Sequence, residues 1–207
     1  YGNPINVVRT VNDVIDQGIA CAILEDQEWP KRCGHLDGKR VISIEEHVEK
    51  IRAVRSVSWE SGLVIVARTD TRAELGLTDA IQRGNAYYEA GADVIFIEAP
   101  QTEEELGEIP SALPDIPLLA NMIVGGKAPC LSAQDLEKLG FKLGVFALSG
   151  LFAATKGIED CFRFLKENGT TSGFEKRSLL ADYKEIISIK KYQELEGKFS
   201  IRKPHTE

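Results

Sequence analysis

The sequence predicts an α/β fold built on a parallel sheet, for three reasons. Short apolar runs alternate with longer amphipathic stretches from residue 7 to residue 168. The short runs are apolar throughout, as expected for parallel strands that are buried on both faces. Each run is followed by polar residues, and barrel enzymes place their chemistry at the carboxyl ends of their strands. This strict alternation implies right-handed β-α-β connections.

The five expected strands are the short apolar runs. In chain order they cover residues 19–24, 63–67, 94–97, 118–120 and 143–147. The polar residues at or just after their ends are Glu25, Arg68 with Asp70, Glu98, Asn121 and Ser149.

The amphipathic stretches carry signals for the starts and ends of helices. Ser43 and Thr102 each stand three residues before a glutamate, which is the spacing of a capping box. Gly91 and Gly140 follow the last periodic residue of their stretches, where glycine commonly ends a helix. Helices are therefore expected over residues 7–16, 44–57, 78–90, 102–113, 132–139 and 151–168. His47 is expected on an exposed helix face, without a role.

Two architectures fit this alternation: an open doubly wound sheet and a closed barrel. No Gly-x-Gly-x-x-Gly motif follows a strand, which weakens the dinucleotide-binding version of the open sheet. Polar residues at every strand end favour a barrel, because there they converge on one mouth. We therefore expect a (β/α)₈ TIM-type barrel. Since five of eight strands are recognisable, the N-terminal strands are expected to lie upstream of residue 1.

Residues 1–169 are expected to form this partial barrel, the catalytic domain, and residues 170–207 a C-terminal helical extension. Within the extension, residues 178–196 are charged and favour a helix. Its apolar residues form one stripe: Leu179, Leu180, Tyr183, Ile186, Ile187, Ile189, Tyr192 and Leu195. Such a stripe is buried either against the same barrel or against another subunit.

Composition excludes several classes of function. The net charge of −7 argues against nucleic acid or an anionic membrane as the main partner. No apolar run approaches the roughly 20 residues of a membrane-spanning helix. The four cysteines form no CxxC pair, and Cys21 and Cys161 are expected to be small buried side chains. These features favour a reducing compartment, and a cytoplasmic location is expected.

The segment Lys31-Arg32-Cys33-Gly34-His35 is the most specific one in the chain. It follows the first strand and has no helical periodicity. Nearby cations lower the pKa of a thiol and favour the reactive thiolate, and glycine lets a backbone approach a ligand closely. Spacing alone leaves two interpretations open: a reactive cysteine, or a solvated loop with an incidental one.

This segment resembles the catalytic-loop signature of the isocitrate lyase, methylisocitrate lyase and dimethylmalate lyase branch of the isocitrate lyase/phosphoenolpyruvate mutase superfamily. Trp29-Pro30 before it and Gly125-Gly126-Lys127 are similar to petal death protein-like members. The similarity continues, in order, through Gly2-Asn3, Glu25-Asp26-Gln27, Ala67-Arg68-Thr69-Asp70, Ala90-Gly91-Ala92-Asp93, Phe96-Ile97-Glu98-Ala99 and Leu119-Ala120-Asn121-Met122.

The resemblance implies a role for each residue of the mouth. Cys33 would be the general acid that protonates a carbanion, with Lys31 and His35 beside it as catalytic residues. The substrate would be bound by Gly34, His35, Arg68, Glu98 and Asn121. Structural ion pairs and mouth hydrogen bonds are the alternative roles. The loop at residues 31–36 is expected to be a lid that closes on ligand.

The resemblance also implies a Mg²⁺ or Mn²⁺ cofactor. Glu25 would reach the metal through water, which suits Mg²⁺ because this ion retains several waters. The direct aspartate ligands are expected upstream of residue 1. The implied assembly is a homotetramer, a dimer of dimers with swapped C-terminal helices.

The implied reaction is retro-aldol cleavage of a small 2-hydroxydicarboxylate, methylisocitrate or a 2-alkylmalate. Two alternatives are oxaloacetate hydrolysis and carboxyphosphonoenolpyruvate phosphonomutase chemistry. The Cys-bearing loop argues against the mutase, whose loop lacks that acid. A third alternative is an inactive truncated paralogue that acts as an assembly partner.

Overall fold

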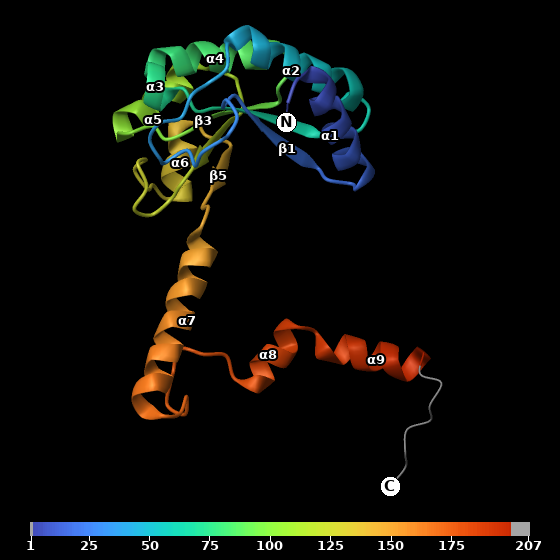
Figure 1. The fold of residues 1–207 in the computed structure, drawn as a ribbon, viewed down its shortest axis with the longest axis vertical. Coiled ribbons are helices and arrows are strands. Elements are labelled where there is room, and N and C mark those ends of the chain that lie inside the picture. The colour runs from blue at the N-terminus through green and yellow to red at the C-terminus, as the bar shows by residue number, and fades with distance from the viewer. Residues whose placement is uncertain (1, 200–207) are drawn as a thin grey trace. The chain divides into compact units, whose positions relative to one another are not determined.

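The computed structural model describes residues 2–199 and contains a five-stranded parallel sheet (Figure 1). Each strand pairs with the next one along the chain, so the order in the sheet is the order in the sequence. An open doubly wound sheet would reverse its order. Winding in one direction gives a half-barrel, which confirms the predicted fold class. The strands are β1 (Cys21–Glu25), β2 (Val64–Thr69), β3 (Val94–Ile97), β4 (Leu118–Asn121) and β5 (Leu143–Val145).

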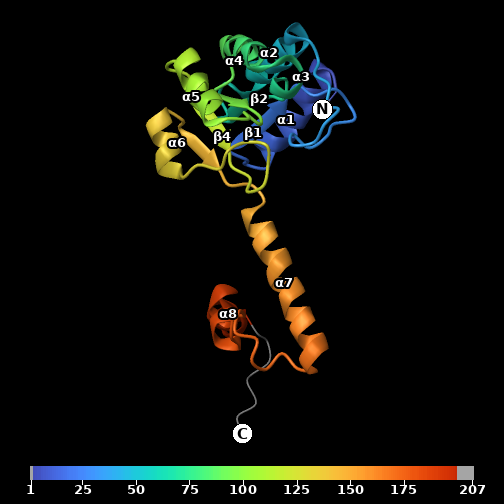
Figure 2. The same ribbon diagram turned by 90° about the vertical axis from the view of Figure 1, so that its left-hand side faces the viewer.

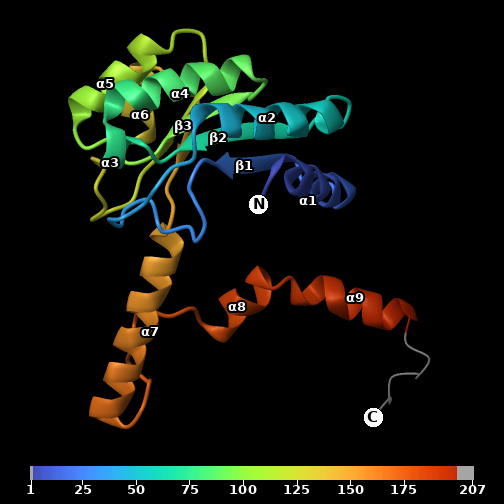
Figure 3. The ribbon, with the colours of Figure 1, turned by 45° about the horizontal axis from the view of Figure 1, so that its top comes forward.

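Helices follow the strands and lie along one side of the sheet (Figures 2 and 3). The predicted caps form: the hydroxyls of Ser43 and Thr102 accept backbone N–H groups three residues on, at 3.1 and 3.2 Å. Gly91 has a φ of +110°, which suits glycine at the end of a helix. The helices of this part are α1 (Pro4–Asp16), α2 (Ile44–Ser58), α3 (Arg72–Leu75), α4 (Leu77–Glu89), α5 (Glu103–Ala112) and α6 (Ala133–Leu139).

Alternation along the strands separates the outer face of the sheet from the inner face. Outer-face residues such as Ile65 and Ile95 belong to the main core with the helices. The residues between them build a second buried cluster on the inner face, namely Val66, Val94, Phe96 and Leu119. Because the side-chain period of a strand is two, the inner face continues at the strand ends with Glu25, Arg68, Glu98 and Asn121. The sheet thus delivers four predicted site residues to one rim.

A buried polar cluster ties the ends of β1 and β2 to α4. The Asp26 carboxylate accepts the backbone N–H of Asp70 at 3.0 Å and the hydroxyl of Tyr87 at 2.8 Å. The guanidinium of Arg83 lies 3.1 Å from the same carboxylate and donates to the carbonyl of Ile42 at 2.8 Å. Burial raises the pKa of Asp26, and these hydrogen bonds and the Arg83 charge oppose that shift. The cluster fixes the backbone immediately beyond the rim.

The chain forms two compact units, Tyr1–Ser149 and Gly150–Glu207. This division lies before the boundary at 169–170 that the sequence predicts, and the sequence boundary stays a prediction. The last helices are α7 (Ser149–Asn168), α8 (Leu180–Ile186) and α9 (Ile189–Phe199). None of the described helices is long and apolar enough to cross a membrane.

The periodicity over residues 178–196 suggested one continuous helix, but the structure has two helices there. Ser188 has a φ of +53°, a left-handed conformation that ends α8 and separates it from α9. Within their own unit the two helices bury none of their side chains. Leu180 and Ile186, for example, are 69% and 70% exposed.

Two expectations about burial are wrong. Cys21 is exposed because it begins the edge strand β1, and Cys161 is only half-buried on α7. His47 is buried rather than exposed, since it shares a helical stripe with Ile51, Val54 and Ser58, which faces the core. Its ring meets the Tyr87 ring edge-on, with 4.6 Å between centroids.

Burial makes His47 a source of pH-dependent stability. Burial, reinforced by neighbouring cations, lowers the pKa of His47 from 6.5 to about 3. Below pH 6.5 the unfolded chain therefore binds a proton at His47 that the folded chain does not. The free energy of unfolding decreases as the pH falls. At pH 5 this loss amounts to about 2 kcal/mol. We predict that the free energy of unfolding of His47→Leu, measured in urea between pH 7.5 and 5, lacks this part of the pH dependence. Identical slopes in both proteins would contradict the prediction.

Candidate functional site

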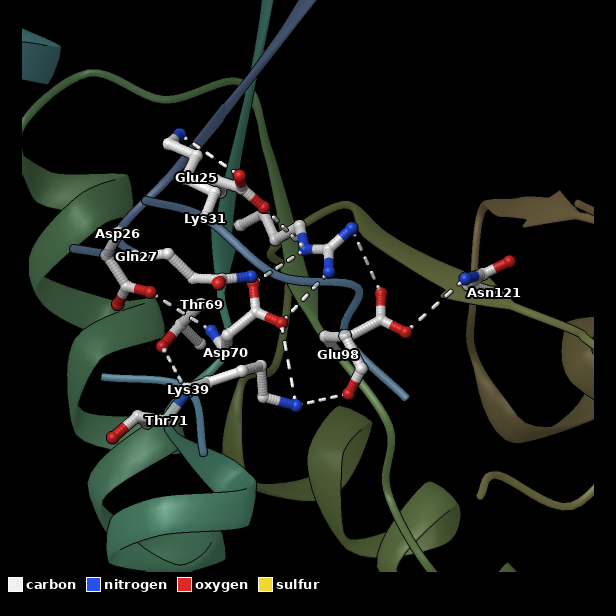
Figure 4. A network of polar contacts seen from close by, with 12 residues as sticks. Glu25, Asp26, Gln27, Lys31, Lys39, Thr69, Asp70, Thr71, Glu98 and Asn121 are labelled. Atoms are coloured by element: carbon white, nitrogen blue, oxygen red, sulfur yellow. Dashed lines mark hydrogen bonds and ion pairs between the residues drawn. The ribbon is translucent and has the colours of Figure 1, made fainter. Parts of the chain in front are cut away.

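Arg68 lies at the carboxyl end of β2, among the carboxylates of Glu25, Asp70 and Glu98 that Figure 4 labels. Its Nε and Nη2 donate to the two oxygens of Asp70 at 2.8 and 2.9 Å, a bidentate pair. Its Nη1 lies 3.4 Å from Glu98, and its Nε lies 3.5 Å from Glu25. Three strand ends therefore direct carboxylates at one guanidinium, which holds them together despite their like charge.

The environment keeps Arg68 charged. Burial alone would lower its pKa, but the hydrogen bonds and charges of Asp70, Glu98 and Glu25 raise the pKa above its ordinary value. The guanidinium also lies over the ring of Phe96, 5.2 Å from its centroid, where a cation is favoured. This cation is a fixed feature of the rim.

Glu98 is almost completely buried, with 2% of its surface exposed. Burial raises the pKa of its carboxyl, while Arg68 opposes the shift. Asn121 donates to its Oε1 at 3.4 Å, and Nε2 of His35 lies 2.9 Å from the same oxygen. Because Nδ1 of His35 accepts the backbone N–H of Lys127 at 2.9 Å, the neutral ring carries its proton on Nε2, facing Glu98.

The Cys-bearing loop rests directly on this network. Gly34 is buried, and a Cβ added there would lie 2.5 Å from Nη2 of Arg68 and 2.5 Å from Cγ of Glu98. No side chain fits in that space, so glycine is required for the loop to approach the rim. The predicted site residues Gly34, His35, Arg68, Glu98 and Asn121 are thus brought together, although their sequence positions span nearly ninety residues.

Residues outside the predicted set hold the loop. The side-chain amide of Gln27 both donates to the carbonyl of Arg32 at 2.8 Å and accepts its N–H at 2.9 Å. Lys127 holds His35 through its backbone and Asp37 through its ammonium, at 2.5 Å. Gly126 lies so close to the His35 ring that a Cβ would meet it at 2.8 Å. Gln27 and the Gly126-Lys127 pair lie in stretches that carry the family resemblance, but nothing in their pattern indicates contact with the loop.

Lys39 is a buried cation at the site that sequence reasoning missed. It is 2% exposed, and its ammonium donates to the carbonyl of Gly34. Lys31, by contrast, pairs with Glu25 at 3.0 Å and remains partly exposed. A lysine that follows a glycine in a loop carries no local signal of burial, so only the folded chain identifies Lys39.

Cys33 is exposed on the docked loop. Its two neighbours are both held, Arg32 by Gln27 and Gly34 by Lys39 and the rim. A pocket of about 790 Å³ is lined by Glu25, Trp29, Lys31, His47 and Arg68 among others. Cys33 is not part of the pocket wall, so the structure positions its backbone without directing the thiol into the pocket.

The described residues do not form a primary metal site. Among residues 2–199 no group of three or more His, Cys, Asp or Glu side chains could hold a metal ion. The three rim carboxylates are directed at Arg68, and Glu25 is also paired with Lys31. The donor set therefore fits a buried guanidinium and not a divalent cation.

Known proteins resemble the chain along nearly its whole length. Residues 1–165 match the family model described as phosphoenolpyruvate phosphomutase. The chain is 42% identical over 203 residues to carboxyvinyl-carboxyphosphonate phosphorylmutase of Arabidopsis thaliana. The match covers 96% of the chain and 60% of that protein. It is 40% identical to petal death protein of Dianthus caryophyllus, covering 96% of the chain and 62% of the relative. The chain thus spans about three fifths of these relatives' length.

Solved structures give the same result. Oxaloacetate acetylhydrolase, bound to 3,3-difluorooxalacetate, superposes with a TM-score of 0.88 and 32% identity, covering 96% of the chain and 67% of that structure. A crystal structure of 2,3-dimethylmalate lyase superposes with a TM-score of 0.88 and 30% identity, covering 97% and 67%. The chain therefore belongs to the phosphoenolpyruvate mutase/isocitrate lyase superfamily.

Proposed function

We propose that the protein containing this chain is a carbon–carbon lyase that cleaves a small 2-hydroxy di- or tricarboxylate, a 2-alkylmalate or methylisocitrate. One observation carries the proposal: the Cys33 loop packs its Gly34 against Arg68 and Glu98. A proton donor and a carboxylate-binding cation are thereby held at one rim. Relatives named 2,3-dimethylmalate lyase, of Eubacterium barkeri, and 2-methylisocitrate lyase, of Bacillus subtilis, are 38% and 39% identical.

The proposed reaction is a retro-aldol cleavage. The substrate hydroxyl releases its proton to solvent, its oxygen becomes a carbonyl, and the carbon–carbon bond breaks with its electron pair left on the carbon beside a carboxylate. Cys33 gives its thiol proton to that carbon. The resulting thiolate regains a proton before the next turnover, so the reaction consumes no other reactant. Cations near the developing charge lower the barrier.

Arg68 is proposed to bind a substrate carboxylate through Nη1. Asp70 occupies Nε and Nη2, whereas Nη1 has only the 3.4 Å contact with Glu98. Because burial raises the pKa of Glu98, this carboxyl gives up its charge more easily than a surface glutamate. A neutral Glu98 would compete less strongly with a substrate carboxylate for Arg68. Asn121 would then orient Glu98, with which it shares a hydrogen bond.

Lys31, Gly34 and His35 are proposed to complete the site. Lys31 stands beside Glu25 at the pocket wall, where its charge would attract the second carboxylate. His35 would present its Nε2–H to the same region once substrate displaces Glu98. Closure of residues 31–36 over the substrate would exclude water, which would otherwise protonate the carbanion without control.

We propose that the complete protein uses Mg²⁺ or Mn²⁺, as the family resemblance implies. Such an ion would polarise the 2-hydroxy or 2-oxo group of the substrate. Glu25 would act only through water, because its oxygens already meet Lys31 and Arg68. No step is assigned to the ion, since the described residues do not supply its ligands.

Oxaloacetate hydrolysis is the second candidate, because oxaloacetate acetylhydrolase is among the most similar solved structures. A screen of the complete protein with isocitrate, methylisocitrate, dimethylmalate and oxaloacetate separates the two. Turnover of oxaloacetate alone would replace the lyase proposal. Failure to turn over any of the four, together with weak Mg²⁺ binding in a titration, would favour an assembly partner without activity of its own.

The proposed assembly is a homotetramer with swapped C-terminal helices. The apolar side chains of α8 and α9 are exposed within their own unit, and burial of one leucine or isoleucine contributes roughly 1.5–3 kcal/mol. A small-molecule substrate and a cytoplasmic location remain predictions of the sequence, and one relative carries the description chloroplastic.

We predict that Cys33→Ser reduces kcat by about 10²–10⁴-fold, because a hydroxyl is a much weaker acid than a thiol. Folding, measured by circular dichroism, should not change, since Cys33 is exposed. Cys130→Ser is the matched control, because Cys130 is also an exposed free cysteine and should keep full activity. Retention of more than about a tenth of kcat in Cys33→Ser would exclude the acid role.

We predict that removing residues 174–207 from the complete protein abolishes the tetramer, as measured by light scattering. The double variant Leu180→Asp/Ile187→Asp should do the same without shortening the chain, because it places charges on the apolar side chains of the segment. Glu185→Lys, which changes a charge between them, serves as the control and should remain tetrameric. A stable tetramer after the deletion would rule out swapped helices.

A further inference from the structure

Lys39 is buried in a place where an ammonium is costly. Only 2% of the residue is exposed, and moving a charge out of water is unfavourable unless it is paired and hydrogen-bonded. Its nearest acceptor is the backbone carbonyl of Gly34. Its nearest opposite charge is Asp70, at 4.0 Å, which is already bidentate with Arg68. The carbonyl of Gly34 is therefore the closest partner of the ammonium, and Asp70 is shared between Lys39 and Arg68.

The backbone around Lys39 is fixed at the base of the loop. The carbonyl of Arg40 accepts the N–H of Glu28 at 2.8 Å, and the N–H of Ile42 donates to the carbonyl of Asp26 at 2.8 Å. Gln27 and Val41 form an antiparallel bridge between the two ends of the loop. Lys39 therefore extends from a rigid base, and its ammonium reaches the loop residue next to Cys33.

The contact at Gly34 connects two parts of the site. Figure 4 shows the Lys39 ammonium directed toward Asp70, the carboxylate that orients Arg68. The other supports of the loop, Gln27 at Arg32 and Lys127 at His35, contact neither Asp70 nor Arg68 through any bond found in the described chain. Among these supports, Lys39 is thus the one that lies between the loop and the substrate-binding cation.

We propose that Lys39 is a positioning residue, which holds Gly34 against Arg68 and Glu98 and so sets the position of Cys33 in the docked loop. The proposal rests on the lyase function for its effect on catalysis, but the contact of Lys39 with Gly34 is independent of the reaction. When the ammonium is removed, the loop keeps only its flanking supports. Cys33 is then presented to the substrate in a fraction of the molecules.

Amide hydrogen exchange of the complete protein, without substrate, tests whether Lys39 holds the loop. In Lys39→Met the amides of residues 32–36 should exchange about tenfold to a hundredfold faster, since a hydrogen bond to a charged group is lost. The amides of β2 and β3 should keep their rates. Lys138→Met, which removes an exposed ammonium paired with Asp135, is the matched control and should leave the loop unchanged. If Lys39→Met does not fold, Lys39→Gln is measured instead, because it introduces no charge and fills less volume.

Equal acceleration in the loop and the strands would overturn the proposal, because it would mean that Lys39 only stabilises the fold. Unchanged loop exchange would also overturn it. With a substrate that the wild type cleaves, Lys39→Met should lower kcat more than tenfold and change KM less, since Arg68 remains in place. A fall in binding alone would contradict the positioning role. If the wild type cleaves none of the four acids, the lyase proposal fails. The exchange rates still decide whether Lys39 holds the loop.

Discussion

The bidentate pair between Arg68 and Asp70 is the interaction on which the site depends. It lies at the end of β2, and each partner is held from a different direction. Asp26 fixes the backbone N–H of Asp70, and Arg83 and Tyr87 hold Asp26 in turn. Removing one member of a buried pair typically costs 3–5 kcal/mol, because the other charge is left unpaired. The buried contacts of Asp26 therefore fix Asp70, and Asp70 in turn orients Arg68.

Around this pair, like charges are brought close together. Glu25, Asp70 and Glu98 approach one guanidinium from three strands, and Glu98 responds with a raised pKa caused mainly by its burial. A parallel sheet makes this arrangement possible, because neighbouring strands end side by side and alternate residues share a face. The same arrangement leaves no room for a side chain at position 34, where the loop backbone meets Arg68 and Glu98.

The loop owes its docked position to residues on both sides of it in the sequence. Gln27 precedes it, Lys39 follows it, and Lys127 comes from the segment after β4. Each meets a backbone group or the His35 ring, so the loop can be held without any constraint on the Cys33 side chain. The thiol remains exposed, as the proposed acid role requires.

Local patterns in the sequence were sufficient for the strands, the capped helices and the rim residues from Glu25 to Asn121, because period, capping and strand ends are read from neighbouring residues. His47 has helical spacing with Ile51 and Val54, yet it was expected on an exposed helix face. Other features depend on distances that no local pattern encodes. The break at Ser188 is one backbone angle, and the burial of Lys39 arises only when the end of β2 meets a loop thirty residues earlier. Tertiary packing decided these, because it alone determines which polar groups lose contact with water and must find partners inside the protein.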